Sequence, residues 1–343
     1  MTTGAGVHLV TGGAGFMGTL IVERLRAAGH RVRSLDIHRD PASVDGVDCV
    51  VGDVRDRATV ARCMRDVEVV HHAAALVPLT KSGEAFHTVN VDGSRVVAEE
   101  AARAGAARFV HISSSAVYGV PPCPITRATP TEPVEIYGHA KLAGERAVQE
   151  ACDAAGLPLL IIRPRTILGR GRLGLYQFLF EWIREGRDFY VIGSGHNRFQ
   201  YVQADDLMDA WQLLLDHGRT GAFAVGTDRF GTFRESLETL IQHAGTASRV
   251  RSLPARPAVA TLRLLDRLRL SPLAPWHYLT SHVDFYCDVQ PLLDLGWRPR
   301  YSNDAMLAAC YDWFLAHPDA VDGGSPHRSA LRQGVLRVLK RLS

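Results

Sequence analysis

The segment EIYGHAKLAGE, residues 135–145, contains a tyrosine and a lysine suited to proton transfer. Tyr137 and Lys141 are four residues apart, so they lie on one face if the segment is helical. A free phenol titrates near pH ~10, and a neighbouring positive charge lowers its pKa by favouring the phenolate. The chain has three lysines against 36 arginines, and lysine is the compact point charge that can also reach a ribose. The pair therefore predicts an acid/base tyrosine assisted by an ammonium.

A run of serines, HISSSAVYG (111–119), follows a predicted strand. Ligands of open α/β sheets bind at the carboxyl ends of the strands. We therefore expect Ser114 to hydrogen-bond the substrate oxygen that Tyr137 protonates or deprotonates. Taken alone, the run has a second, less favoured interpretation as a hydroxyl-rich turn.

The stretch VHLVTGGAGFMGTLIVERL places Gly12, Gly15 and Gly18 between a predicted strand and a predicted helix. Such glycines let the backbone approach a pyrophosphate at the positive end of the helix. A three-glycine turn alone is weak evidence, but Asp36 ends the second predicted strand, about 20 residues on, as a dinucleotide site requires. Its carboxylate suits a ribose diol and repels a 2′-phosphate, which favours NAD over NADP, although Arg39 lies close by.

Two further features have competing interpretations. Asp53, in VVGDVRD after the third predicted strand, is placed to meet the adenine edge, or else caps the helix predicted over 56–65. His71 and His72 are expected to pack near the cofactor and not to bind a metal. The six cysteines form no CxxC pair or zinc spacing, so we predict no metal site and reduced thiols.

The element pattern supplies the scaffold for these residues. Short β-branched runs alternate with helical patterns, which predicts a doubly wound parallel sheet, an α/β Rossmann fold. The strands are expected at 7–10, 31–36, 47–53, 67–73, 107–113 and 157–163, and the helices at 15–28, 56–65, 84–104 and 138–155. The later helices are expected at 173–186, 204–217 and 232–245, between short strand-like pieces such as DFYVIG and AFAVG.

We divide the chain into a mainly NAD-binding domain (1–163), a smaller α/β substrate lobe interleaved with it (164–318) and a basic tail helix (319–343). The net charge of +3 is spread along the chain, which argues against a nucleic-acid partner. No apolar run approaches the roughly 18 residues of a membrane span, and no signal peptide is evident, so we expect a cytoplasmic protein. The tail is expected to pack on its own or a partner subunit, with membrane-surface contact as the alternative.

Together these motifs resemble the extended short-chain dehydrogenase/reductase family, which includes nucleotide-sugar epimerases, dehydratases and 3β-hydroxysteroid-dehydrogenase-like enzymes. The resemblance covers roughly residues 6–317. The matching segments are TGGAGFMG (11–18), Asp36, GDV (52–54), HHAAA (71–75), NVDG with Asn90, SSSAVYG (113–119), YGHAK (137–141), RPR (163–165), VQADDL (202–207) and LGWRPRYS (295–302).

The resemblance implies a Ser-Tyr-Lys centre, with Ser114 orienting the substrate, Tyr137 as the acid/base and Lys141 on the nicotinamide ribose. It also implies a homodimer through helices 84–104 and 138–155. The expected cofactor-binding residues are Gly12, Gly15, Phe16, Met17, Gly18, Asp36, Asp53, Val54, Ala73, Ala74, Ala75, Asn90, Tyr137, Lys141 and Pro164. The expected substrate residues are Val77, Ser115, Arg165, Thr166 and Arg198.

Departures from the family patterns narrow the reaction. Ser115-Ala116 stand where the dehydratases carry an acidic pair, so elimination of water is disfavoured. An NAD preference argues against a dedicated reductase. The favoured interpretation is a sugar-nucleotide 4-epimerase that forms a transient 4-keto intermediate.

The alternative is a hydroxyl dehydrogenase or ketoreductase on a sugar-nucleotide, sterol-like or polyketide substrate. RPRTILG (163–169) resembles the steroid-dehydrogenase branch, and the stretch 276–297 lacks the basic residue with which many sugar-nucleotide relatives grip a diphosphate. Arg165, Arg198 or a histidine would have to replace that contact. A non-catalytic cofactor sensor is a third possibility.

Overall fold

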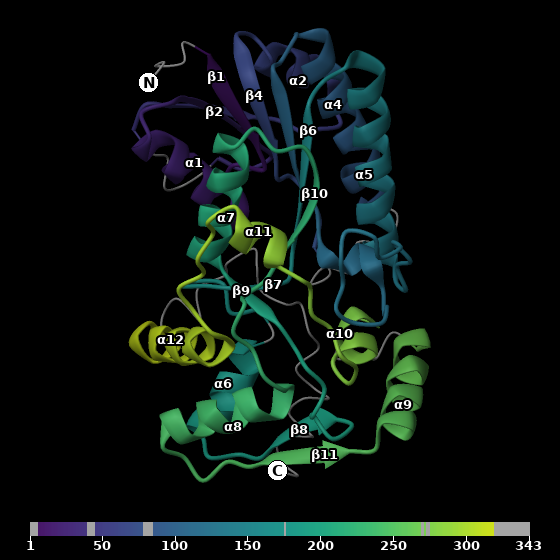
Figure 1. The fold of residues 1–343 in the computed structure, drawn as a ribbon, viewed down its shortest axis with the longest axis vertical. Helices are drawn as coiled ribbons and strands as arrows, with labels where there is room; N and C mark the ends of the chain where they lie inside the picture. Colours follow the sequence, from purple (N-terminus) through teal and green to yellow (C-terminus); the bar gives the residue numbers. More distant parts are fainter. Residues whose placement is uncertain are drawn as a thin grey trace.

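The computed structural model describes residues 6–39, 45–77, 85–174, 176–268, 271 and 275–318. Its centre is a parallel sheet of seven strands in the order β10-β6-β5-β4-β1-β2-β3 (Figure 1). The strands are apolar and alternate with helices along the chain. Helices can therefore cover both faces of the sheet, as a parallel sheet requires. The strands are β1 (Val7–Thr11), β2 (Arg31–Asp36), β3 (Val47–Val51), β4 (Val67–His72), β5 (Arg108–Ile112), β6 (Leu159–Pro164) and β10 (Gly221–Val225).

Helices pack on both faces of the sheet, so the predicted doubly wound fold is confirmed. One face is covered by α1 (Phe16–Ala27) and α7 (Ala204–Asp216), whose apolar sides share a core that includes Ile21 and Trp211. The other face is covered by α2 (Arg57–Cys63), α4 (Ser94–Arg103) and α5 (Ile136–Ala155), around a second core that includes Val97 and Val148.

The segment predicted as one helix over 84–104 is divided into three pieces. A short α3 (Ala85–His87) leads into a π-helical turn at Thr88–Gly93 and then into α4. Asn90 lies in the π-turn, where its side chain accepts a hydrogen bond from the backbone N–H of Leu76 at 2.8 Å and donates to the Leu76 carbonyl at 3.1 Å. The prediction of a continuous helix was wrong because periodicity does not reveal this side-chain-to-backbone contact.

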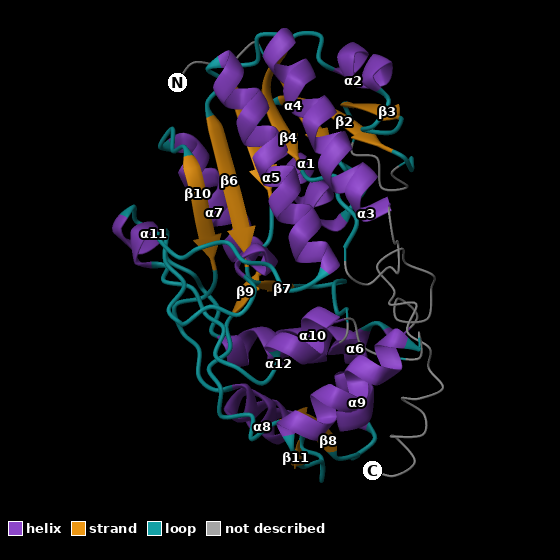
Figure 2. Cartoon of the chain, turned by 90° about the vertical axis from the view of Figure 1, so that its right-hand side faces the viewer, coloured by secondary structure: helices purple, strands orange, loops and turns teal. Residues whose placement is uncertain are grey.

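The remaining elements form a lobe at the carboxyl end of the sheet, toward which the β6 and β10 arrows point in Figure 2. Its core includes Phe180, Tyr201, Phe285 and Phe314. The elements are β7 (Thr166–Leu168), α6 (Tyr176–Arg184), β8 (Phe189–Ile192), β9 (Tyr201–Gln203), α8 (Phe233–Ala244), β11 (Val250–Leu253), α9 (Ala255–Arg267), α10 (Pro275–Thr280) and α12 (Asn303–Ala316). The short α11 (Gln290–Asp294) instead packs, through Leu292, in the core shared by α1 and α7.

The division at residue 163 is not a clean spatial boundary. AFAVG, predicted as part of the lobe, is β10, which pairs in parallel with β6 and completes the large sheet. The helix α7 likewise packs beside α1 on that sheet. The chain therefore enters the lobe after β6, returns to the sheet, and enters the lobe again.

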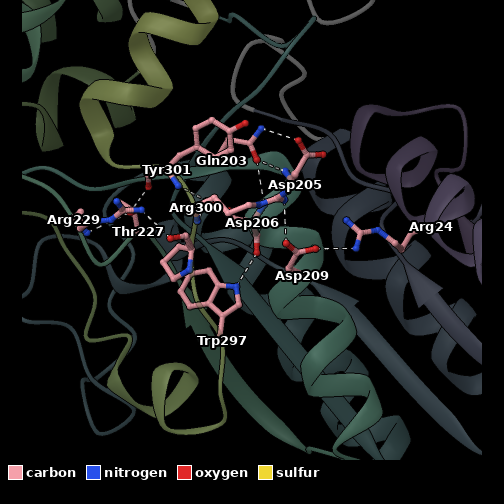
Figure 3. A network of polar contacts seen from close by, with 11 residues as sticks. Arg24, Gln203, Asp205, Asp206, Asp209, Thr227, Arg229, Trp297, Arg300 and Tyr301 are labelled. Carbon is pink, nitrogen blue, oxygen red and sulfur yellow. Dashed lines mark hydrogen bonds and ion pairs between the residues drawn. The ribbon is translucent and has the colours of Figure 1, made fainter.

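A polar network joins the VQADDL and LGWRPRYS segments (Figure 3). The carboxylate of Asp206, on α7, accepts hydrogen bonds from Arg300 Nε at 3.1 Å and from the backbone N–H of Tyr301 at 3.1 Å. Asp209 pairs with Arg300 and with Arg24 of α1. These contacts fix the chain that follows α11 against the large sheet, so these two motifs serve the fold.

Four histidines lie buried in the sheet, which makes the stability of the fold sensitive to acid. Burial lowers the pKa of His8 to about 4 and that of His72 to about 3, and it also depresses the pKa of His71 and His111. Below pH ~6.5, the usual pKa of a histidine in an unfolded chain, the unfolded protein therefore binds more protons than the folded protein does.

We expect stability to fall as the pH drops from about 6.5 toward 4, by about 2 kcal/mol at pH ~5 for each histidine that stays neutral in the folded state. Urea unfolding at a series of pH values measures this slope. The control is His217→Ala, which removes an exposed histidine and should show the same dependence of stability on pH as the unaltered protein. A stability that is flat over this range would contradict the prediction.

The helices of the described segments include none that is both long and apolar enough to cross a membrane. The predicted tail helix, 319–343, lies outside the described residues.

Candidate active site

The glycine loop lies between β1 and α1. Gly12 has a φ of +71°, and a Cβ there would lie 2.7 Å from the backbone of Ala74. A Cβ on Gly18 would lie 2.0 Å from the Gly12 carbonyl oxygen. Gly15 caps α1 without a side-chain hydrogen bond, so the first N–H groups of the helix remain for a ligand. The loop therefore fits a pyrophosphate closely.

Asp36 ends β2 beside this loop. Its carboxylate accepts hydrogen bonds from the backbone N–H groups of Ala14 at 3.1 Å and His38 at 2.9 Å. These contacts hold an acidic side chain next to the phosphate-binding turn, where a Rossmann fold places the ribose of its dinucleotide.

Asp53 does not cap the following helix, because Asp56 is the N-cap of α2 and accepts from the N–H of Ala58. Asp53 instead pairs with Arg55 at 2.6 Å, and that guanidinium lowers the pKa of the Asp53 carboxyl. The adenine contact of Asp53 stays a prediction.

Ser114, Tyr137 and Lys141 line one cavity at the carboxyl edge of the sheet. Ser114 follows β5 and begins a short 3₁₀ turn, Ser115–Tyr118, where its hydroxyl accepts from the N–H of Ala116 at 3.1 Å. Tyr137 and Lys141 lie in the first turns of α5, which begins after Glu135; the Glu135 carboxylate accepts from the Tyr137 N–H at 2.8 Å. The structure thus brings the three predicted catalytic residues together.

The charges around the tyrosine differ from the sequence expectation. Burial raises the pKa of Tyr137, while the hydroxyl of Ser114 and the charge of Arg172 act to lower it. The Lys141 ammonium donates to the Ile112 carbonyl at 2.7 Å, and burial lowers its pKa to about 8. An influence of Lys141 on the phenol of the NAD-bound enzyme stays a prediction.

Arg172 was not predicted as a site residue. Its guanidinium lies 4.8 Å from the centre of the ring of Phe16, the first residue of α1, and Arg172 lines the cavity. Within the described part of the chain, that guanidinium has no hydrogen bond or ion pair. The only sequence signal was its place in RGR (170–172), directly after the ILG that follows RPRT.

We predict that Arg172→Leu shifts the pH–rate profile to higher pH, because the pKa of Tyr137 rises when a nearby cation is removed. At neutral pH the rate falls, and it recovers as the pH is raised. The control is Arg170→Leu, which removes an exposed arginine two residues away. Identical pH profiles for the two variants would contradict the assignment.

The cavity has a volume of about 860 Å³ and continues from the tyrosine into the lobe. Its described lining includes the cations Lys141, Arg165 and Arg172 and no aspartate or glutamate. The lobe end is lined mainly by apolar and aromatic side chains, among them Leu173, Phe178, Leu179, Trp182, Phe189, Val191, Ile192, Phe199, Phe233, Leu253, Pro257, Ala258, Leu262, Leu265 and Trp276.

The other predicted residues divide into two groups. Those that line the cavity are Gly12, Gly15, Phe16, Met17, Gly18, Ala73, Ala75, Val77, Ser115, Pro164, Arg165 and Thr166. Asp36, Asp53, Val54, Ala74 and Asn90 lie outside that lining. Arg198 is also outside it: its guanidinium is exposed and stacks on the rings of Phe230 at 4.7 Å and Tyr286 at 4.5 Å.

The sheet order, the glycine loop, Asp36 and the Ser-Tyr-Lys cluster define a Rossmann-type enzyme that uses a nicotinamide dinucleotide. The family model of the NAD-dependent epimerase/dehydratase family matches residues 8–226. The protein belongs to that family, which confirms the predicted resemblance, the enzyme class and NAD as the cofactor.

Relatives of several activities are similar to the chain. An uncharacterised protein of Sinorhizobium fredii is 38% identical, with 96% of this chain and 85% of that protein covered. A UDP-glucose 4-epimerase of Mycolicibacterium smegmatis is 31% identical, with 89% and 97% covered. A 3-beta-hydroxysteroid dehydrogenase of Mycolicibacterium neoaurum is 25% identical, with 92% and 93% covered.

Solved structures share the fold. The Bordetella bronchiseptica enzyme WbmG, in complex with NAD, has a TM-score of 0.74 at 21% identity, with 94% of this chain and 97% of that chain covered. The UDP-glucose 4-epimerase of Thermotoga maritima, with UDP-glucose, has a TM-score of 0.74 at 22% identity, with 91% and 100% covered. At these identities the likeness establishes the fold alone.

Proposed function

We propose that the protein catalyses the NAD-dependent oxidation of a secondary alcohol, or the reverse reduction of a ketone, on a substrate with a large apolar body. The observation that carries this proposal is the lining of the cavity. Its reactive end holds Ser114, Tyr137 and Lys141, while its lobe end is lined mainly by aliphatic and aromatic side chains. Such a lining binds apolar surface and orients it with few polar groups.

The residues divide the work of proton transfer between them. Tyr137 takes the hydroxyl proton of the substrate, and Ser114 donates a hydrogen bond to the same oxygen. The Lys141 ammonium has three N–H donors. One of them donates to the Ile112 carbonyl, so the other two remain for the ribose. NAD, when bound, accepts the hydride; Gly12, Gly18 and Asp36 are the residues that would hold it.

Support for a sugar-nucleotide substrate is weaker in this cavity. A diphosphate needs several donors, and Arg198, one of the residues expected to supply them, is exposed and stacked on Phe230 and Tyr286. Arg165 is 2% exposed, and its Nη1 already donates to Ser115, so the rest of this single guanidinium is a small donor set for a diphosphate. Of the other two cations in the described lining, Lys141 donates to the Ile112 carbonyl and Arg172 is left for a phosphate.

A sugar-nucleotide 4-epimerase is the second candidate. The favourable observations are the 31% identity to a UDP-glucose 4-epimerase and the Ser115-Ala116 pair, which lacks the acidic groups for elimination. In that cycle the keto intermediate rotates and the hydride returns to its other face, so no NADH accumulates.

Nicotinamide absorbance separates the two candidates. The purified protein is incubated with NAD and either a 3β-hydroxysteroid or UDP-galactose. Our proposal expects NADH to accumulate in proportion to the oxidised steroid, with UDP-galactose unchanged. Conversion of UDP-galactose to UDP-glucose at constant NADH would replace our proposal by the epimerase.

We also propose that the protein forms a homodimer through α4 and α5. These helices pack side by side on one face of the sheet, and Arg95 and Glu150 pair between them at 3.1 Å. Light scattering of the purified chain tests the mass, and a monomer at micromolar concentration would refute this proposal.

A further inference from the structure

Arg165 is a buried cation for which the described residues supply no anionic partner. It is 2% exposed, and its recorded side-chain hydrogen bond runs from Nη1 to the Ser115 hydroxyl at 3.1 Å. Among the described residues, its Nε and Nη2 atoms have no hydrogen-bond partner. A buried charge is costly unless it is paired and hydrogen-bonded. The folded chain therefore retains a guanidinium whose charge its described residues do not neutralise.

The neighbouring Arg163 shows how this fold satisfies a guanidinium that has only a structural role. Arg163 donates to both carboxylate oxygens of Glu145, at 2.9 and 2.6 Å, and to the Tyr118 hydroxyl at 2.9 Å. Arg165, two residues later on the same stretch of chain, has no such carboxylate in the part of the chain that the structure describes. The difference points to a ligand as its partner.

Arg165 lies in the wall of the cavity that also holds Ser114 and Tyr137. The guanidinium carbon lies 4.0 Å from the centre of the Phe285 ring and 5.0 Å from that of Phe199. These aromatic faces stabilise the cation in part but offer no hydrogen-bond acceptor to Nε and Nη2. Arg165 and Ser115 both line the cavity, and Ser115 is adjacent to Ser114.

We propose that Arg165 binds a carboxylate of the substrate, near the carbon that is oxidised or reduced. Nε–H and Nη2–H point from the same edge of the planar guanidinium, and this edge matches the two oxygens of a carboxylate. One guanidinium suits one negative charge, whereas a phosphate would call for further donors. The substrate class is then an apolar hydroxy or keto acid, and this assignment rests on the function proposed above.

The test is equilibrium binding to the NADH-loaded protein by isothermal calorimetry; NADH cannot accept a hydride from a hydroxy probe, so no turnover accompanies binding. The probes are β-hydroxymyristate, its methyl ester and tetradecyl phosphate. We expect the acid to bind the unaltered protein at least about 10-fold more tightly than the ester, as a charge-assisted hydrogen-bonded pair should. In Arg165→Met the acid and ester should bind equally, whereas Arg170→Met should retain the preference for the acid.

The outcomes are distinguishable. Equal binding of acid and ester to the unaltered protein, binding of neither, or a preference that survives in Arg165→Met would overturn the proposal. If tetradecyl phosphate binds more tightly than the acid, the Nε–Nη2 edge of Arg165 binds a phosphate, and the carboxylate proposal is overturned. If NAD no longer raises the melting temperature of Arg165→Met, the variant is misfolded and Arg165→Lys replaces it. Lysine keeps the positive charge but cannot make the two-point contact. If Arg165→Lys prefers the acid over the ester as strongly as the unaltered protein does, the bidentate carboxylate contact is refuted.

This experiment measures affinity without turnover. Failure of the oxidoreductase proposal, seen as no change in nicotinamide absorbance, leaves the binding result standing. Failure of the carboxylate proposal leaves the redox assay unaffected.

Discussion

Tyr137→Phe is expected to lower turnover by about 1,000-fold, because a positioned acid/base contributes roughly 10²–10⁴-fold to a rate. The phenol lines the cavity within reach of the Ser114 hydroxyl and the Arg172 charge. Phenylalanine keeps the ring and removes the proton-transferring oxygen. The measurement is steady-state turnover together with the affinity for NAD, which should change little.

A matched substitution separates chemistry from packing. Tyr311→Phe removes a hydroxyl from a buried tyrosine of α12 that does not line the cavity. It should leave turnover within about 2-fold, since changes away from a site usually have small effects. Turnover retained by Tyr137→Phe would exclude the tyrosine as the acid/base and with it the proposed mechanism.

Gly18→Ala is expected to weaken NAD binding by about 100-fold, a free-energy change of about 2.7 kcal/mol. The added Cβ would lie 2.0 Å from the Gly12 carbonyl oxygen and 2.6 Å from the Gly13 Cα. Both contacts are with backbone, so the phosphate-binding turn must move, and overpacking of this kind also costs stability. Calorimetric titration with NAD and a melting curve measure the two effects.

Gly231→Ala is the control for this substitution. There the new Cβ would meet the flexible carboxylate end of Glu235 at 2.7 Å, in the lobe and outside the cavity lining. Its affinity for NAD should match that of the unaltered protein. An unchanged NAD affinity in Gly18→Ala would show that the turn does not hold the pyrophosphate.

The sequence by itself determined the sheet and the place of the reactive residues along it. Apolar strands alternating with helical periodicity predicted six of the seven parallel strands, with AFAVG seen as strand-like but assigned to the lobe. The Gly12, Gly15 and Gly18 spacing and Asp36 predicted the dinucleotide class. These features are local, since each depends on a neighbour along the chain or on the general rule that parallel strands end at one edge.

Only the tertiary structure decided which charges face the site. Arg163 pairs with Glu145, and Arg172 contacts Phe16; in both cases the two residues lie apart in the sequence. Within the described residues no carboxylate lies beside Arg165, and this too depends on which elements pack around it. The same is true of the apolar lobe end of the cavity, built from α6, β8, α9 and α10. Periodicity reports which side of an element is buried, whereas the partner of a buried charge depends on how the elements pack.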